Sequence, residues 1–427
     1  MIEIRPAQQA LDIRVSVPGD KSISHRALIF AALADGDSTL SHLGTGADVR
    51  STARVLQQMG VRIELGDPAR VTSAGLDALI ASEDPLDVGN SGTTIRLMSG
   101  LLSGRPFRSV LTGDESIRQR PMGRIIRPLS QMGARIVSET NETAPLTIQP
   151  ASLHGIEYHM PVASAQVKSA IILAGLQVTM GETVIHEKSL SRRHTEMMLS
   201  KFGAPVLVAG KKITVGKLEQ PLAPFNLKVP GDPSSGAYWA AAAAIIPGSR
   251  CRIDDVNLSP ERIAFYQVLK EMGTEVAIQV RDSTIEPRGD ITVKHQPLHG
   301  VRLKKDAIPS LIDELPLIAV VGAFGEGSTV IREARELRVK ETDRINATVT
   351  NLRAMGAEVE EYPDGLTVSS GSTVEGATLD SFGDHRIAMA FGVAALGAES
   401  TSSIEDHEVA SVSYPEFWDL LQNRVEV

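Results

Sequence analysis

Apolar and polar positions follow a repeating order along this chain. Six apolar segments each end in a short turn that holds a glycine, and a β-rich run follows the turn. The turn glycines follow one another at intervals of roughly 70 residues, which is the spacing of an internal repeat. They are Gly36, Gly104, Gly181, Gly248, Gly327 and Gly397. The pattern predicts six apolar helices, each followed by a strand.

A second pattern lies between these segments. It consists of amphipathic segments that close on Met-Gly or Phe-Gly, where glycine is expected as a helix C-cap because it enters the left-handed region without a Cβ penalty. The closing glycines are Gly60, Gly133, Gly203, Gly273 and Gly356. A further helix, Glu416–Asn423, would run into the C-terminus. We therefore predict six repeats with the order β-α-β-α-β-β.

The sequence Val-Pro-Gly-Asp occurs twice, beginning at Val17 and at Val229. These copies mark equivalent points in two halves of the chain. We expect one domain over residues 14–230 with repeats one to three. The other domain would combine residues 1–13 with 231–427 and hold repeats four to six, the N-terminal strand completing the shortened last repeat. Two such domains would place an active site in the cleft between them.

Composition describes a globular chain with an ample core. Hydrophobic residues make up 42% of the 427 positions and charged residues 22%, and the net charge of −9 argues against nucleic acid or anionic membranes as partners. The longest apolar run, Ala237–Pro247, is too short to span a bilayer. The single cysteine, Cys251, allows neither an intramolecular disulfide nor a cysteine metal cluster. The first strand begins almost at once, so we expect no leader peptide and a cytoplasmic protein.

Polar residues stand at the start of each predicted apolar helix. A helix N-terminus favours anions through its free N–H groups and its dipole. The first helix adds two cations and a hydroxyl there, from Lys21, Ser22 and Arg26. A capped helix with solvated cations is the alternative interpretation. The six starts are Asp20-Lys21-Ser22, Asn90-Ser91-Gly92-Thr93, Ser164-Ala165-Gln166, Asp232-Pro233-Ser234-Ser235, Asp313-Glu314 and Asp384-His385-Arg386.

Other charged residues fit a cleft that binds several anionic groups. Arg120 is one of three arginines around a Pro turn, and arginine offers bidentate contacts to carboxylate or phosphate. Lys340 and Arg344 share a helical face, with Glu341 between them and Asp313 at an earlier helix start. Two separate carboxylates suit general acid–base catalysis. No His-x-x-x-His pattern, P-loop or Rossmann fingerprint indicates a metal or nucleotide site.

Together these motifs resemble those of the 5-enolpyruvylshikimate-3-phosphate synthase family of enolpyruvyl transferases. The resemblance spans the whole chain, with the motifs in family order and spacing. They are Pro-Gly-Asp-Lys-Ser-Ile-Ser-His-Arg, Gly-Asn-Ser-Gly-Thr, Arg-Pro-Met-Gly, Ser-Ala-Gln-Val-Lys-Ser, Arg-Val-Lys-Glu-Thr-Asp-Arg and Gly-Asp-His-Arg. The resemblance implies an α/β (α+β) protein that forms a two-domain inside-out α/β barrel, or β/α prism, with pseudo-threefold symmetry in each domain.

The resemblance also implies a reaction and its residues. Phosphoenolpyruvate and shikimate 3-phosphate would give an enolpyruvyl ether and phosphate, in a monomer without metal or cofactor. Asp313 would take the proton from the 5-hydroxyl, Glu341 would protonate the methylene carbon, and Lys21 would assist. Shikimate 3-phosphate would be held by Lys21, Ser22, Arg26, Ser164, Ala165, Gln166, Arg192, Asp313 and Lys340. Phosphoenolpyruvate would be held by Lys21, Asn90, Gly92, Arg120, Gln166, Arg344 and Arg386.

The chain departs from some family members at several positions. Val412 stands where some members have a lysine, Leu97 where some have proline, and Glu336 where some have asparagine, while Ser-Ala-Gln replaces Ser-Ser-Gln. These differences leave sensitivity to glyphosate open. One alternative is an enolpyruvyl transferase acting on UDP-N-acetylglucosamine, but the loop Gly113–Gln119 lacks its cysteine. The other, a non-catalytic repeat protein that binds polyanions, does not explain an intact Asp313 and Glu341.

Overall fold

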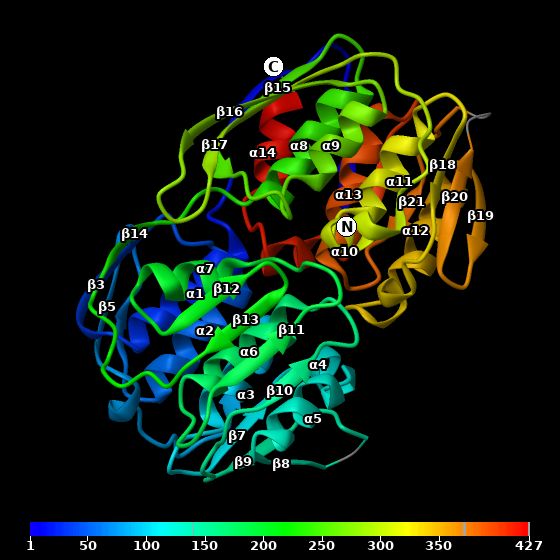
Figure 1. The fold of residues 1–427 in the computed structure, drawn as a ribbon. Helices are drawn as coiled ribbons and strands as arrows, with labels where there is room; N and C mark the ends of the chain where they lie inside the picture. Colours follow the sequence, from blue (N-terminus) through cyan, green and yellow to red (C-terminus); the bar gives the residue numbers. More distant parts are fainter. Residues whose placement is uncertain (140, 370–372, 426–427) are drawn as a thin grey trace. The chain divides into compact units, whose positions relative to one another are not determined.

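The chain forms two compact units (Figure 1). The computed structural model describes residues 1–139, 141–369 and 373–425. The central unit is Gly19–Val229, and the terminal unit combines Met1–Pro18 with Pro230–Val427. Each unit carries three sheets.

The central unit repeats one sheet pattern three times. In each sheet the first strand is parallel to the second, and the other two are antiparallel. The strand orders are β14-β3-β5-β4, β6-β7-β9-β8 and β10-β11-β13-β12. Their bounds are β3 Asp35–Ser41, β4 Arg62–Glu64, β5 Ala69–Ala74, β6 Leu86–Asp87, β7 Ser109–Thr112, β8 Arg135–Ser138, β9 Leu146–Gln149, β10 Glu157–His159, β11 Thr183–His186, β12 Val206–Ala209, β13 Lys212–Val215 and β14 Asn226–Lys228.

The terminal unit has one sheet with the same pattern and two sheets that have three strands each. Its strand orders are β16-β17-β15-β2, β18-β20-β19 and β1-β22-β21. β1 pairs antiparallel with β22, so the N-terminal strand completes the sheet of the sixth repeat. The bounds are β1 Ile2–Ile4, β2 Asp12–Val15, β15 Arg250–Asn257, β16 Glu275–Asp282, β17 Arg288–Lys294, β18 Ser328–Ile331, β19 Glu358–Tyr362, β20 Gly365–Ser369, β21 Thr378–Asp380 and β22 Ser402–Glu405.

Two strands belong to a different unit from the repeat that follows them in the chain. β2 precedes the first repeat but pairs in parallel with β15 of the fourth. β14 precedes the fourth repeat but pairs in parallel with β3 of the first. The expected boundary between residues 13 and 14 is therefore wrong, because it lies inside β2. The two units divide after Pro18 and after Val229.

The first helix of each repeat is buried nearly all round. Every residue of α8 and α11 is buried, which explains why these segments are apolar almost throughout. Helices of the central unit are α1 Lys21–Ala32, α2 Ala47–Gln58, α3 Gly92–Leu102, α4 Glu115–Gln119, α5 Gly123–Gln131, α6 Ala165–Gly175 and α7 His194–Lys201, with a 3₁₀ turn at Leu76–Ala78. Those of the terminal unit are α8 Pro233–Ile245, α9 Ala264–Glu271, α10 Ile308–Leu311, α11 Leu315–Ala323, α12 Arg344–Ala354, α13 His385–Gly397 and α14 Phe417–Val425, with 3₁₀ segments Lys305–Ala307, Arg335–Val339 and His407–Val412.

The second helix of each of the first five repeats ends as predicted. The Met or Phe is the C-cap, and the glycine after it has a positive φ, between 83° and 109°. The sixth such helix, α14, begins one residue after the predicted Glu416. These caps are local, so the sequence alone predicts them.

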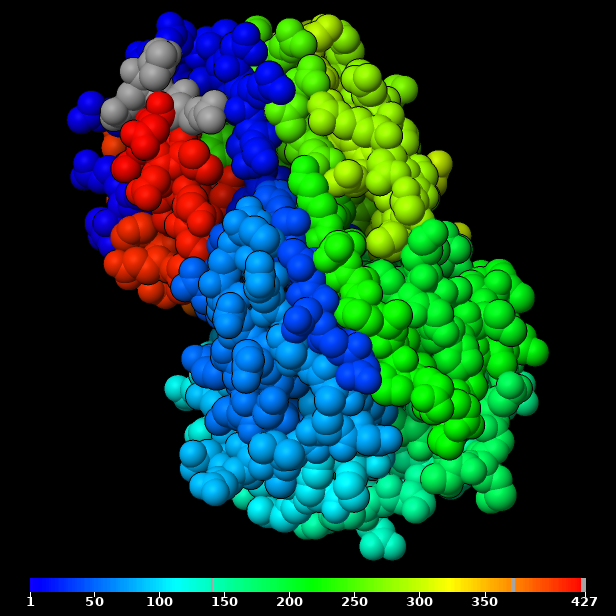
Figure 2. Space-filling model, turned by 90° about the vertical axis from the view of Figure 1, so that its left-hand side faces the viewer, coloured from blue at the N-terminus to red at the C-terminus, as the bar shows by residue number. Residues whose placement is uncertain are grey.

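Small residues let the buried helices approach closely. A Cβ on Gly100 of α3 would lie 2.1 Å from the carbonyl oxygen of Ala170 on α6, so the two backbones touch. In the terminal unit, the N-terminal residues lie against the C-terminal segment, dark blue beside red in Figure 2. Among the described residues no helix has the length and apolar character needed to cross a membrane.

Candidate functional site

Polar residues cap the first helices of the repeats, as the sequence predicts. Side-chain oxygens accept a first-turn N–H in five of the six, and these caps are Asp20, Ser91, Ser164, Asp232 and Asp384. The remaining first helix, α11 of the fifth repeat, begins after Glu314 and has no side-chain cap. Each cap leaves other first-turn N–H groups for a ligand.

Side chains join the starts of α3 and α6 in the central unit. The Arg96 guanidinium donates to Gln166 Oε1 at 2.7 Å and to the Gly92 carbonyl at 3.2 Å. The Gln166 amide in turn donates to Thr93 Oγ1 at 2.9 Å. The predicted site residues Gly92 and Gln166 therefore lie together, although 74 residues separate them (166 − 92). Arg96 and Thr93 are not among the predicted site residues, although their place in the first turns of a polar helix start was a signal for them.

Gly92 is constrained by two guanidinium groups and not by its backbone conformation. A Cβ at this position would lie 2.8 Å from Arg96 Nη1 and 3.0 Å from Arg120 Nη1. Its φ is not among the positive values found for other glycines. Arg120 Nη2 donates to Asn90 Oδ1 at 2.6 Å, and Asn90 Nδ2 donates to Asp114 at 2.7 Å. The structure therefore gathers Asn90, Gly92 and Arg120 at the start of α3.

Arg26 is buried and connects three helices. Its Nε donates to Thr195 Oγ1 of α7 at 2.6 Å, and its Nη2 to Ser169 Oγ of α6 at 2.7 Å. Its Nη1 donates to the Ser22 carbonyl at 2.8 Å. The guanidinium is planar and always charged, so these contacts hold a positive charge at the starts of α1 and α6. A direct contact of Arg26 with a ligand stays a prediction.

Lys21 and His25 extend the polar network of α1. Lys21 Nζ forms an ion pair with Asp48 Oδ2 at 3.0 Å. His25 Nδ1 lies 2.6 Å from Thr52 Oγ1, and Thr52 lies 2.7 Å from Thr94 Oγ1. Burial, with the charges of Lys21 and Arg26, holds the pKa of His25 well below its usual value. The imidazole is therefore neutral at pH 7 and serves as a hydrogen-bonding link between α1 and α2.

A buried lysine positions the segment that carries Arg192. Lys168 Nζ on α6 pairs with Glu187 at 3.1 Å and with Glu196 at 2.6 Å, and all three side chains are buried. Glu187 Oε1 accepts from the Ser191 backbone N–H at 3.1 Å and from its hydroxyl at 2.6 Å. Lys168 is thus a structural cation, whose partner carboxylate fixes the residue just before Arg192.

The terminal unit gathers its predicted residues around Arg344. Its guanidinium pairs with Asp384 and with Glu341, each at 2.7 Å, and lies 3.6 Å from Asp313 Oδ1. Arg386 Nη2 lies 3.6 Å from Asp313 Oδ2. The structure therefore brings the two predicted acid–base carboxylates to one guanidinium.

Further carboxylates, which the sequence did not mark as ionic partners, complete this cluster. Glu314 Oε1 lies 3.5 Å from Arg386 Nη1 and accepts from Ser234 Oγ at 2.5 Å. Asp232 accepts from Arg262 Nη2 at 2.6 Å. Asp384 and Glu314 were visible only as helix starts. Their ionic partners lie elsewhere in the sequence, so no local pattern marks them.

Burial and neighbouring carboxylates oppose each other at the two cations Lys340 and Arg344, and the balance differs between them. Burial lowers the pKa of Lys340, helped by Arg344 and opposed by Asp313 and Glu341. Burial also acts to lower the pKa of Arg344, but Asp384 and Glu341 outweigh it and raise the pKa. Lys340 is therefore the cation of this cluster that loses its proton most readily.

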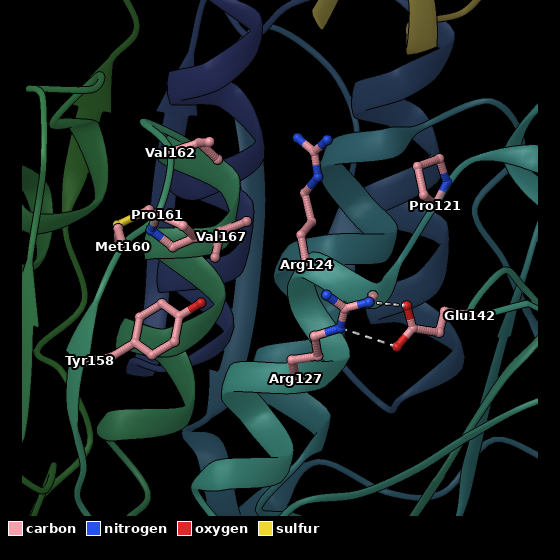
Figure 3. Close-up of a pocket in the computed structure, with 10 residues that line it drawn as sticks. Pro121, Arg124, Arg127, Glu142, Tyr158, Met160, Pro161, Val162 and Val167 are labelled. Carbon is pink, nitrogen blue, oxygen red and sulfur yellow. Dashed lines mark hydrogen bonds and ion pairs between the residues drawn. The ribbon is translucent and has the colours of Figure 1, made fainter.

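A pocket of about 230 Å³ lies in the central unit (Figure 3). Arg124 and Arg127 of α5 lie across it from Tyr158 of β10 and Val167 of α6. Arg127 pairs with Glu142 at 2.8 Å. Pro121 and Val167 line the pocket, and each directly follows a predicted site residue in the chain, Arg120 and Gln166 respectively.

Two positions at which this chain departs from some family members are occupied by apolar side chains, one buried and one half-buried. Leu97 is fully buried in α3 and belongs to the core. Val412 ends the 3₁₀ segment His407–Val412 and is half-buried. An apolar side chain at Val412 supplies no charge there.

Comparisons with known proteins agree with this arrangement. Residues 6–421 match the sequence model of a family described as EPSP synthase (3-phosphoshikimate 1-carboxyvinyltransferase). A relative from Synechococcus sp. (strain JA-3-3Ab), named 3-phosphoshikimate 1-carboxyvinyltransferase, is 47% identical over 432 residues, which cover 100% of this chain and 97% of the relative.

Solved structures show the same fold. EPSP synthase from Acinetobacter baumannii superposes with a TM-score of 0.87 at 38% identity, covering 99% of this chain and 97% of that one. The enolpyruvyl transferase NikO from Streptomyces tendae superposes with a TM-score of 0.80 at 18% identity, covering 99% and 96%. This second likeness concerns the fold alone. Together they confirm the predicted fold class, an inside-out α/β fold of two domains.

Proposed function

The chain belongs to the EPSP synthase family, and on that premise we propose how its residues divide the work of the reaction. It is an enolpyruvyl transferase of the shikimate pathway, which moves the enolpyruvyl group of phosphoenolpyruvate to shikimate 3-phosphate and releases phosphate. The family assignment removes the alternatives of a transferase acting on UDP-N-acetylglucosamine and of a non-catalytic polyanion binder.

The central unit supplies the donors for both anionic substrates in this proposal. Lys21, Gly92, Arg120 and Gln166 hold phosphoenolpyruvate, with Asn90 orienting the Arg120 guanidinium. The 2.6 Å bond from Arg120 to Asn90 supports that orienting role. Shikimate 3-phosphate is held by Lys21, Ser22, Arg26, Ser164, Ala165, Gln166 and Arg192. Free N–H groups at helix starts and bidentate arginines suit phosphate and carboxylate oxygens.

The terminal unit supplies the acid and the base. Asp313 takes the proton from the 5-hydroxyl of shikimate 3-phosphate while the hydroxyl oxygen bonds to C2 of phosphoenolpyruvate. Glu341 gives a proton to C3 of phosphoenolpyruvate. In the elimination Glu341 takes a proton back from the new methyl group, and Asp313 gives its proton to the departing phosphate. Both carboxyl groups thus return to their starting states. Lys340 binds shikimate 3-phosphate, and Arg344 and Arg386 bind phosphoenolpyruvate.

One observation carries this division of roles. Asp313 and Glu341 lie on the two terminal nitrogens of the same Arg344 guanidinium, at 3.6 Å and 2.7 Å. An acid and a base that serve neighbouring atoms of one substrate must lie close together. The shared Arg344 guanidinium, itself assigned to a substrate, holds the two carboxyl groups in one place.

The direct test is phosphate release from phosphoenolpyruvate. We expect release only when shikimate 3-phosphate is present, and none with UDP-N-acetylglucosamine. Release that does not depend on the shikimate ester would contradict the proposal. A control with Glu341→Gln, which keeps the size of the side chain but not the acid, should bind both substrates and release little phosphate.

The same proposal covers the setting of the enzyme. We place it in the cytoplasm as a monomer that needs neither cofactor nor catalytic metal. The net charge of −9 argues against nucleic acid as a partner. Sedimentation velocity of the purified chain tests the monomer, which a stable dimer would contradict.

A further inference from the structure

Two histidines and a glutamate meet on adjacent strands of the central unit. Glu157 and His159 are both on β10, two residues apart, and so they share one face of the sheet. His186 ends the neighbouring strand β11, directly opposite His159 in the parallel register. Tyr158, between the two β10 residues, points to the other side and lines the pocket of Figure 3. The cluster is therefore separate from that pocket.

The three side chains place their ligating atoms close together. His186 Nε2 lies 2.9 Å from Glu157 Oε1, and His159 Nε2 lies 3.8 Å from the same oxygen. One ligating atom from each residue lies within 4.8 Å of the other two. The imidazole rings are stacked with 4.4 Å between centroids and 7° between planes. Among the described residues, this is the one group of three histidine, cysteine or carboxylate side chains whose ligating atoms lie this close together.

Two of these separations lie close to what a tetrahedral metal ion needs. Nitrogen and oxygen ligands lie about 2.0–2.2 Å from Zn²⁺, which places neighbouring ligand atoms about 3.3–3.6 Å apart. The observed 2.9 Å and 3.8 Å lie on either side of that range. The side chains of Glu157 and His159 are 64% and 74% exposed, and that of His186 is 31% exposed. Small rotations that aim the three donors at one ion therefore disturb no core packing.

We propose that Glu157, His159 and His186 bind one divalent transition-metal ion of the zinc, nickel and copper class. Imidazole nitrogen suits these metals, whereas Mg²⁺ and Ca²⁺ prefer oxygen ligands. Water completes the coordination, since the cluster faces solvent. No motif announces the site, because His159 and His186 are 27 residues apart (186 − 159) and only strand pairing joins them.

The ion links two strand ends that lead into the candidate site. β10 ends at His159, five residues before Ser164, the cap of α6. β11 ends at His186, and the next residue, Glu187, holds Ser191 by two hydrogen bonds. A metal bound to both histidines therefore fixes the spacing between the segments that start here. The metal site itself depends on none of the substrate assignments.

Calorimetric titration of the tag-free, full-length chain with Zn²⁺, after removal of metals by a chelator, tests the site. We expect one equivalent of Zn²⁺ to bind, and His159→Ala and His186→Ala each to weaken binding by about tenfold or more. His154→Ala is the matched control, because His154 is an exposed histidine just before the same strand. An unchanged affinity in both site variants, or an equal loss in the control, overturns the proposal. If Zn²⁺ does not bind saturably to the parent chain, the three side chains form an ion pair only and the proposal is wrong.

Two further readouts locate the ion and guard against misfolding. The electron paramagnetic resonance spectrum of bound Cu²⁺ should show two coupled imidazole nitrogens in the parent chain and one in either histidine variant. Zn²⁺ should slow amide exchange at residues 157–160 and 184–187 of the parent chain. Slowed exchange elsewhere, or two nitrogens retained in the variants, contradicts the assignment. Variants with the parent's circular dichroism and melting temperature make the comparison valid.

Discussion

Arg344 Nε donates to Asp384 Oδ2 at 2.7 Å, and both side chains are buried. Asp384 also caps α13 by accepting the Arg386 backbone N–H at 2.8 Å. One carboxylate therefore positions both arginines that we assign to phosphoenolpyruvate, one through its side chain and the other through its backbone. Asp384 itself has no assigned contact with a substrate, so it is a positioning residue.

Asp384→Asn should be strongly destabilising although it keeps the size of the side chain. Asparagine can still cap α13, but it removes the fully buried carboxylate from Arg344 and leaves only the partly exposed Glu341 and Asp313 as its charge partners, which costs up to about 3–5 kcal/mol. Urea denaturation measures the free energy of unfolding. Glu275→Gln is the control, because its pair with Lys294 at 2.6 Å is half exposed and should contribute less than about 1 kcal/mol. Equal losses in the two variants would contradict a special role for Asp384.

Asp313→Ala and Glu341→Gln should each reduce turnover by about two to four orders of magnitude, the range for general acid–base groups. Shikimate 3-phosphate should still bind to Glu341→Gln, because that side chain is assigned to proton transfer and not to this substrate. Steady-state kinetics with a phosphate assay gives kcat, and calorimetry gives the dissociation constant. Near-normal turnover in either variant would remove that residue from the mechanism.

Gly92→Ala should separate glyphosate from phosphoenolpyruvate. The added methyl would press on the ends of Arg96 and Arg120, at 2.8 Å and 3.0 Å. We expect a higher KM for phosphoenolpyruvate and a larger rise in the glyphosate inhibition constant, since glyphosate is the longer molecule. Affinity for shikimate 3-phosphate should change little.

The melting temperature checks the alternative explanation for Gly92. This glycine lacks a positive φ, so alanine should fit the backbone and leave the fold stable. Gly356→Ala is a useful contrast, because its φ of +83° makes alanine costly by about 1 kcal/mol or more. A lowered melting temperature in Gly92→Ala with an unchanged ratio of the two constants would contradict a ligand contact.

Lys168→Met should destabilise the central unit and also weaken binding of shikimate 3-phosphate. It leaves Glu187 and Glu196 buried without their cation, at a cost of about 3–5 kcal/mol, and it frees the segment before Arg192. Lys217→Met is the matched control, since its pair with Glu219 is exposed. Amide exchange at residues 187–193 reports the segment. Faster exchange is expected only in Lys168→Met, and unchanged exchange there would show that Lys168 does not hold it.

The lowered pKa of Lys340 predicts two opposite responses to rising pH. The ammonium binds the anionic substrate, so affinity for shikimate 3-phosphate should fall as pH rises through the lowered pKa, below the usual 10.5. The unfolded chain binds the proton more tightly than the folded chain in this window, so the free energy of unfolding should rise with pH there.

Lys340→Arg gives the control for this pH dependence. Arginine stays charged throughout the range, so the loss of affinity at high pH should move upward or disappear. Calorimetric binding between pH 7 and pH 10 measures it. The same pH profile in both proteins would assign the effect to another group.

The repeat and its helix ends follow from the sequence alone. The caps Asp20 and Ser91, and the glycines after Met59 and Met272, act within a few residues of themselves, so a local pattern predicts them. The family motifs along the whole chain also identify the reaction from the sequence alone, by resemblance. Burial of the first helices also follows, because a segment with no polar face must be covered on every side.

Only the tertiary structure decided which distant groups meet. The pairing of β2 with β15 places residues 14–18 with the terminal unit, whereas we expected them in the other domain, because β-strand pairing depends on partners that no local pattern marks. The pairing of Arg344 with Asp384 joins residues 40 positions apart, and that of His159 with His186 joins two strands. Hydrophobic periodicity encodes which face of an element is buried, but it does not encode which other element covers that face.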